Sequence, residues 1–161
     1  MDTLTCKKKC CVLKVEEYKH NYFNKRNIKK KSKAGVFIFD SKTKKILLVQ
    51  SRGNFWGPPK GTMQYGETWL SCAIREVYEE TGLNINQDKF SKVLKIKSTS
   101  MYFFLDMEEC NVDIQHTISD NDANGIGWIK IECLFELINN GFIKINKHCE
   151  FLINKFLIEY L

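Results

Sequence analysis

The segment 61–83, GTMQYGETWLSCAIREVYEETGL, decides the fold of this 161-residue chain more than any other stretch. Its apolar residues repeat every three or four positions, at Leu70, Ala73, Ile74 and Val77. This spacing is typical of an amphipathic helix with one buried face. Thr68 is a suitable N-cap and Gly82 a suitable left-handed C-terminal residue, so the pattern predicts a helix over 69–81.

The same helix carries three glutamates at i, i+3 and i+4, namely Glu76, Glu79 and Glu80. A step of about 100° per residue places their carboxylates on one narrow strip beside the buried face. Like charges at this spacing cost stability, so a solvated acidic helix, which is the alternative, gains nothing from them. A bound divalent cation would reverse that cost, because hard cations prefer clustered carboxylate oxygens.

Strand and loop patterns surround this helix. Apolar runs predict strands at 34–40, 46–50, 92–97, 100–107 and 126–131, a short helix at 134–139 and a closing helix at 146–160. Glycines and both prolines mark 52–60 as a loop, and polar residues predict a flexible loop over 108–125. Mixed strands with two main helices predict an α/β fold.

Composition limits the class of protein. The chain is long enough for one domain, and 43% hydrophobic with 12% aromatic residues indicates a globular one. No run of 18 apolar residues exists, so we expect no membrane span. The N-terminus has charges where a signal peptide needs an apolar stretch, so we expect a cytoplasmic protein in a reducing environment.

Positive charge is concentrated at the N-terminus. Residues 1–33 contain eleven Lys/Arg and three Asp/Glu, a net charge of +8, whereas residues 34–161 have a net charge of −2. We therefore divide the chain into a basic extension over 1–32 and a domain over 33–161. Such an extension can hold a polyanion such as RNA, and the alternative is a solvated, partly disordered leader.

Seven cysteines are scattered along the chain. Free thiols are the preferred interpretation, with Cys72 as a reduced core residue or one that supports the glutamates. Cys6, Cys10 and Cys11 form a C-x3-CC cluster without a second ligand pair at zinc spacing, and a redox or metal role for this trio is the alternative.

The glutamate segment resembles the signature of the Nudix hydrolases. Gly61 is followed after five residues by Glu67, and seven further residues lead to Arg75 and Glu76, with Gly82 near the end. The likeness in motif covers 57–83, and the strand pattern extends it to about 33–160. The resemblance implies an α/β/α sandwich with a mixed central sheet. It also implies hydrolysis of a diphosphate linkage by water attack on phosphorus.

The resemblance also assigns a metal site. Glu76, Glu79 and Glu80 would bind Mg²⁺, or Mn²⁺, together with the backbone carbonyl of Lys60, and Glu67 would bind a further metal ion or cap the loop. Oxygen ligands without His or Cys suit both ions.

Two supporting roles remain in this interpretation. Arg75 would hold the glutamates through i,i+4 pairing with Glu79. The general base would be one of the carboxylates, or Asp120 or Asp122 from the loop before the last strand, where no glutamate stands.

The substrate contacts lie outside the signature. The run WGPPKG over 56–61 is similar to segments of dinucleoside polyphosphate hydrolases and mRNA-decapping enzymes. Lys60 is placed to meet a phosphate, with Arg52 from the same loop. Phe55, Trp56 and Tyr102 are candidates to stack on a base, with core or loop packing as the alternative. Trp128 is assigned to the core.

The leading function is therefore metal-dependent cleavage of a nucleoside di- or polyphosphate, or of a dinucleoside polyphosphate. One alternative is decapping of capped RNA, with the basic extension and the lysines of the last helix as an RNA track. A second is a catalytically silent nucleotide- or RNA-binding module. Pairing into a homodimer through a strand at 10–18 is a further expectation.

Overall fold

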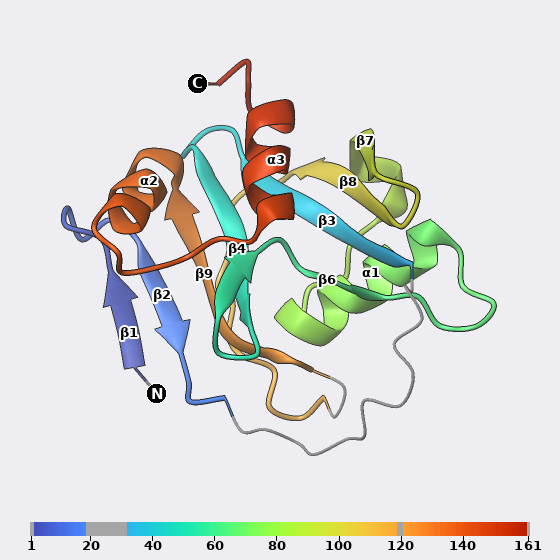
Figure 1. The fold of residues 1–161 in the computed structure, drawn as a ribbon, viewed down its shortest axis with the longest axis horizontal. Helices are drawn as coiled ribbons and strands as arrows, with labels where there is room; N and C mark the ends of the chain where they lie inside the picture. The colour runs from blue at the N-terminus through green and yellow to red at the C-terminus, as the bar shows by residue number, and fades with distance from the viewer. Residues whose placement is uncertain (1, 19–31, 119–120, 161) are drawn as a thin grey trace.

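One mixed β-sheet organises the protein (Figure 1). The computed structural model describes residues 2–18, 32–118 and 121–160. Within these residues the sheet has nine strands, with the order β1-β2-β9-β4-β3-β8-β7, while β5 pairs with β4 and β6 with β3. The strands are β1 (Asp2–Thr5), β2 (Val12–Val15), β3 (Lys33–Asp40), β4 (Lys45–Ser51), β5 (Phe55–Gly57), β6 (Lys60–Thr62), β7 (Phe90–Ile96), β8 (Ser100–Asp106) and β9 (Ala123–Lys130). Only the β3–β8 pair is parallel among the described strand pairs.

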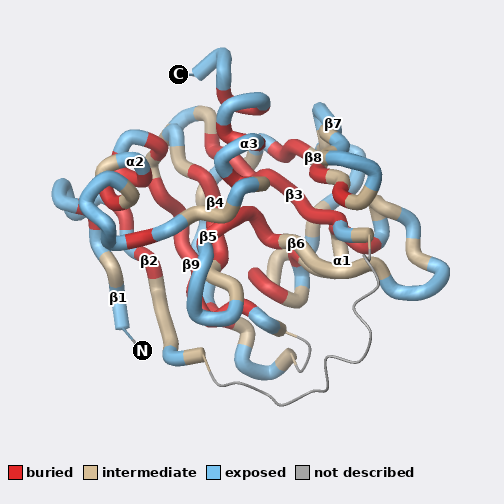
Figure 2. The backbone as a smooth tube through the Cα atoms, in the orientation of Figure 1, coloured by how far each residue is buried: buried red, intermediate tan, exposed pale blue. Residues whose placement is uncertain are grey.

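Helices cover both faces of this sheet. The helices are α1 (Trp69–Thr81), α2 (Ile131–Asn139) and α3 (Lys147–Phe156), with a short 3₁₀ turn at Gln87–Lys89. Side chains of β3 alternate between two cores, because Phe37 and Phe39 pack with α2 and α3 whereas Val36 and Ile38 pack with α1. Figure 2 shows β3 buried along most of its length. The predicted α/β/α sandwich with a mixed sheet is confirmed.

The signature helix has the predicted ends. Thr68 is the N-cap, and its hydroxyl accepts a hydrogen bond from the Ser71 amide at 3.1 Å. Gly82 ends the helix in the left-handed region at φ 78°, and its amide donates to the Tyr78 carbonyl at 2.8 Å. Local sequence therefore sets the position of every residue on α1, including the glutamates.

Part of the N-terminal segment belongs to the sheet. β1 and β2 form a hairpin, and β2 pairs with β9 so that Leu13 is only 1% exposed. The predicted extension over 1–32 is therefore not separate from the domain in its first half, while its basic stretch 19–31 lies outside the described residues. The strand that we expected to pair with a second copy is β2, and it already pairs with β1 on one side and with β9 on the other.

The C-terminal elements are close to the expectation. β9 begins at Ala123 and shortens the predicted loop, α2 begins three residues earlier than predicted, and α3 ends at Phe156. Trp128 is 5% exposed and lies in the core, as predicted. Within the described residues, no helix is both long and apolar enough to cross a membrane.

Candidate metal and phosphate site

Side chains of opposite charge line a single cavity of about 310 Å³ beside α1. Its carboxylates are Glu76, Glu80 and Asp122, and its cations are Lys33, Arg52 and Lys60. The carboxylates offer oxygen ligands for a cation, and the basic groups offer partners for an anion. The cavity therefore offers groups that could bind a cation next to groups that could bind an anion.

Glu80 is the buried member of the glutamate strip. It is 3% exposed, and its Oε1 accepts a hydrogen bond from the Lys60 amide at 2.7 Å. Burial raises the pKa of Glu80 to about 8, although the Lys60 amide favours the ionised form. A bound cation would stabilise the ionised form of this buried carboxylate in place of the proton.

Glu76 lies directly against the backbone of β6. A methyl group placed on Gly61 would lie 2.0 Å from Glu76 Cδ, so only glycine leaves room for this carboxylate. Burial raises the pKa of Glu76 to about 7, while the charge of Arg75 acts in the opposite direction. The glycine that opens the signature is thus required by the close approach of a ligand side chain.

Arg75 holds three glutamates in place. Its Nε donates to Glu67 Oε2 at 2.7 Å, and its Nη1 donates to Glu76 Oε1 at 2.9 Å and to Glu79 Oε2 at 3.0 Å. Hydrogen bonding to Glu67 is the largest of the effects that raise the pKa of this guanidinium. The predicted i,i+4 contact with Glu79 is confirmed, and Arg75 fixes the geometry of the strip.

Glu67 closes the loop before α1. Its Oε1 accepts from the Gln64 amide at 2.7 Å and from Arg75 Nη2 at 2.8 Å. The hydrogen bond from Arg75 lowers the pKa of Glu67. Of its two predicted roles, the capping of the loop is the one for which the structure shows contacts.

The basic side of the cavity comes from three segments. Burial lowers the pKa of Lys60, and the charge of Lys33 lowers it further. Lys33 faces the same cavity because β3 pairs with β6, in the register Lys33 to Thr62. The signature spacing contains no signal for Lys33, and only the register of these strands reveals it.

Asp122 reaches the cavity from the segment before β9. Its Oδ2 lies 3.3 Å from Arg52 Nη2, and its carbonyl accepts from the Arg52 amide at 3.2 Å. The structure therefore brings this candidate base to the glutamates, while Asp120 lies outside the described residues.

Two predicted substrate contacts need correction. Trp56 is 2% exposed and Tyr102 is 0% exposed, and both belong to the core cluster under α2 and α3. The Tyr102 hydroxyl forms a hydrogen bond with His148 Nδ1 at 2.9 Å. Neither ring has a free face for a base, so core packing is the correct alternative for both. Phe55 is 43% exposed and remains a predicted contact.

Cys72, which was expected in the core or in support of the glutamates, is buried. Cys72 is fully buried, its thiol donates to the Gly61 carbonyl at 3.6 Å, and burial raises its pKa to about 11. It is a neutral thiol that packs behind the strand carrying Gly61.

The donor set fits a hard divalent cation. Glu76 and Glu80 line the cavity, whereas Glu79, the third predicted ligand, is not among its lining residues and is paired with Arg75 at 3.0 Å. A strip of carboxylates that faces lysine and arginine is an arrangement that could hold such a cation next to a phosphate group.

The chain belongs to the Nudix family, because the model for the NUDIX domain matches residues 29–145. It is 35% identical over 142 residues to Putative hydrolase 111R of Invertebrate iridescent virus 3, covering 85% of this chain and 82% of the viral protein. The protein is a Nudix pyrophosphohydrolase, and enzymes of this family generally use divalent metals.

Other relatives are longer proteins. Nudix hydrolase 6 of Arabidopsis thaliana is 29% identical and covers 74% of this chain, which spans 45% of the plant protein. The mRNA decapping complex subunit 2 of Schizosaccharomyces pombe is 39% identical over 62 residues, or 35% of this chain and 8% of that protein.

Solved structures share the fold. The NUDIX domain of Shewanella oneidensis NrtR, solved with ADP ribose, superposes with a TM-score of 0.61 at 16% identity, covering 88% of this chain and 95% of that one. A Caenorhabditis elegans Ap4A hydrolase superposes with a TM-score of 0.54 at 22% identity, covering 80% and 98%.

Proposed function

We propose that the protein hydrolyses a diphosphate linkage in a nucleoside di- or polyphosphate, or in a dinucleoside polyphosphate, and that it requires Mg²⁺ or Mn²⁺. One observation carries the proposal. Three carboxylates and three basic side chains line one cavity, which suits a polyphosphate accompanied by a divalent cation.

Each side of the cavity has its own task. Glu76 and Glu80, with Glu79 and the carbonyl of Lys60, would hold the cation. When bound, the cation would neutralise phosphate charge and lower the pKa of a water molecule. Arg75 keeps the glutamates at fixed positions through its hydrogen bonds.

The basic side chains would bind and orient the substrate. Lys60 and Lys33 meet phosphate oxygens as point charges, and Arg52 offers a planar set of donors. Asp122, which Arg52 holds at the cavity, accepts a proton from the attacking water in this proposal. Phe55, three residues after Arg52, is exposed and would provide a surface for the base.

A substrate panel tests the proposal. The full chain is incubated with nucleoside triphosphates, dinucleoside polyphosphates and capped RNA, with Mg²⁺ or Mn²⁺, and products are identified by mass spectrometry in ¹⁸O water. Glu80→Gln should lose hydrolysis, whereas Glu108→Gln, at an exposed glutamate outside the cavity, should keep it. Absence of metal-dependent hydrolysis of every substrate would leave the silent binding module as the better explanation.

Capped RNA is the second candidate substrate. Lys33 lines the cavity two residues after a stretch, 19–31, that contains six Lys/Arg residues, and a decapping subunit is among the relatives. Replacing those six residues by glutamine should weaken cleavage of capped RNA and reduce its salt dependence, while hydrolysis of free nucleotides stays the same. If capped RNA is cleaved equally well by both proteins, the basic stretch is not an RNA track.

A further inference from the structure

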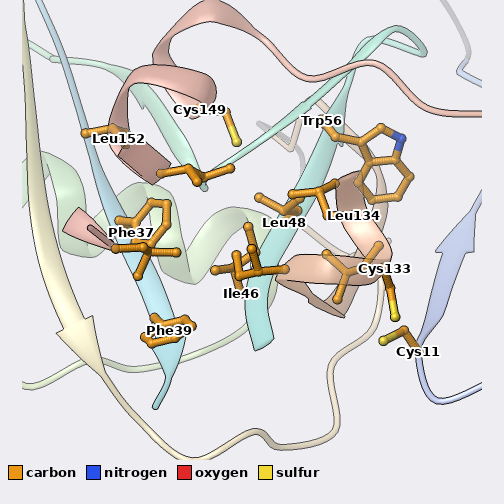
Figure 3. Packing of buried hydrophobic residues seen from close by; sticks show 14 of the residues in the cluster. Cys11, Phe37, Phe39, Ile46, Leu48, Trp56, Cys133, Leu134, Cys149 and Leu152 are labelled. Atoms are coloured by element: carbon orange, nitrogen blue, oxygen red, sulfur yellow. The ribbon is translucent and has the colours of Figure 1, made fainter. Parts of the chain in front are cut away.

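Four cysteines converge at the end of the sheet away from the cavity. Cys6, Cys10 and Cys11 lie in the loop between β1 and β2, and Cys133 lies in the first turn of α2. Cys10 Sγ is 3.5 Å from Cys6 Sγ, 3.6 Å from Cys11 Sγ and 3.6 Å from Cys133 Sγ. All four sulfur atoms lie within 4.8 Å of one another. Figure 3 shows the sulfur atoms of Cys11 and Cys133 turned toward each other.

The spacing of these sulfur atoms fits one metal ion. Zinc binds thiolates at about 2.3 Å in a tetrahedron, which places sulfur atoms about 3.8 Å apart. The three separations from Cys10 Sγ, 3.5 to 3.6 Å, are close to this edge length, and the remaining pairs lie within 4.8 Å. An iron–sulfur cluster would need room for several iron and sulfide ions between the thiolates, and this group is too compact for one.

The loop between β1 and β2 is shaped to present its thiols. The Lys9 amide donates to the Cys6 carbonyl at 3.0 Å, and Lys9 adopts φ 57°, so the chain turns back on itself between the cysteines. Cys6, Cys11 and Cys133 are each at most 3% exposed, and Cys10 closes the group from the solvent side. Three of the four thiols are therefore buried in the protein, which suits a structural zinc site.

Donors and positive charge surround the sulfur atoms. The Lys130 amide donates to Cys11 Sγ at 3.2 Å, and the Lys45 ammonium donates to the Cys10 carbonyl at 2.9 Å. Such contacts stabilise the charge of a zinc–thiolate group.

A disulfide accounts for the arrangement less well. One disulfide joins two sulfur atoms and leaves the other two buried thiols without a reason to converge. The cysteines are free in the structure, and Cys10 is nearly equidistant from its three neighbours.

We propose that Cys6, Cys10, Cys11 and Cys133 bind one Zn²⁺ ion, which ties the N-terminal hairpin to α2. Binding releases the thiol protons to solvent and leaves a group of net charge −2 beside Lys45 and Lys130. The ion would link the loop between β1 and β2 to the first turn of α2, next to the end of β9. Soft sulfur ligands select zinc here, whereas the carboxylate cavity at the other end of β9 selects a hard cation.

Metal content and a cobalt spectrum test this proposal on the full chain. Protein purified under reducing conditions should contain about one zinc ion per chain, measured by inductively coupled plasma mass spectrometry. Replacement of zinc by Co²⁺ should give the charge-transfer absorption of a tetrahedral cobalt–thiolate site. Neither measurement depends on hydrolysis, so this proposal and the proposed function can fail separately.

Two exposed cysteines provide matched variants. Cys10→Ser removes a ligand without disturbing the buried core, and it should lose most of the zinc and weaken the cobalt–thiolate absorption. Cys110→Ser, at an exposed cysteine outside the group, should keep both. Zinc removal should also lower the thermal midpoint of wild type more than that of Cys10→Ser.

Several outcomes would overturn the proposal. Wild-type protein that contains no zinc and shows no cobalt–thiolate absorption would do so, and so would protein that contains iron in place of zinc. Equal zinc content in Cys10→Ser and wild type would also contradict it, as would a disulfide among these cysteines in protein kept reduced.

Discussion

Glu80→Gln should stabilise the metal-free protein. The Glu80 carboxylate is 3% exposed, and burial raises its pKa from 4.5 to about 8. Between these two values the folded state keeps a proton that the unfolded state has already released. Stability therefore falls as pH rises through this window and recovers toward acid pH. Glutamine has no charge to lose, and its side-chain oxygen can still accept the hydrogen bond from the Lys60 amide.

The pKa difference sets the expected size of the effect. At roughly 1.4 kcal/mol per pKa unit, the cost of Glu80 is about 3 kcal/mol at pH 7 and about 5 kcal/mol above pH 8. Allowing for relaxation around the new amide, we expect Glu80→Gln to be more stable by roughly 2–3 kcal/mol at pH 8. For a chain of this length that is a rise of about 5–10 °C in the thermal midpoint.

Thermal unfolding followed by circular dichroism between pH 5 and pH 8.5, with EDTA or with Mg²⁺, measures this effect. The advantage of Glu80→Gln should grow with pH in EDTA. Mg²⁺ at a hundredfold excess over Kd should add about 2.7 kcal/mol to the free energy of unfolding of wild type and so raise its midpoint, and it should leave the variant nearly unchanged.

A neighbouring glutamate supplies the control. Glu79 is paired with Arg75 at 3.0 Å, so Glu79→Gln should lose an ion pair and gain no stability at any pH. The reasoning is refuted if Glu80→Gln is no more stable than wild type at pH 8 in EDTA, or if its advantage does not change with pH.

Three further substitutions test the site. Gly61→Ala places a methyl group 2.0 Å from Glu76 Cδ and should lower kcat about 100-fold with little change in secondary structure, measured by steady-state kinetics and circular dichroism. Arg75→Gln leaves partly buried carboxylates unpaired and should cost about 3 kcal/mol in urea unfolding, and an unchanged midpoint would contradict its role as their anchor. Tyr102→Phe removes the hydrogen bond to His148 and should cost about 1 kcal/mol with kcat/KM unchanged, whereas a tenfold fall in kcat/KM would return Tyr102 to the substrate contacts.

The helix that carries the glutamates was predictable because its information is local. The apolar period of α1 and its caps at Thr68 and Gly82 lie within 15 residues, and the structure has the same bounds. The hairpin of β1 and β2 was not predictable in this way. Its strands have only four residues each, and the hairpin is held in the sheet by the pairing of β2 with β9, more than 100 residues away.

The residues of the candidate site also differ in whether local sequence predicts their position. Glu76 and Glu80 follow from the helical period, but Lys33 depends on the register between β3 and β6. The position of Trp56 depends on a distant glycine, since a methyl group on Gly125 would lie 2.8 Å from the indole Cη2. An aromatic residue in a loop therefore lies in the core because another strand leaves space for it, which the loop sequence alone does not reveal.

The hydrogen bond between the Lys60 amide and Glu80 gives the protein an internal reporter. At 2.7 Å, the chemical shift and hydrogen-exchange rate of this amide depend on whether the carboxylate holds a proton, a cation or neither. A single ¹⁵N-labelled signal can therefore follow the state of the site during a titration, without substrate and without any added probe.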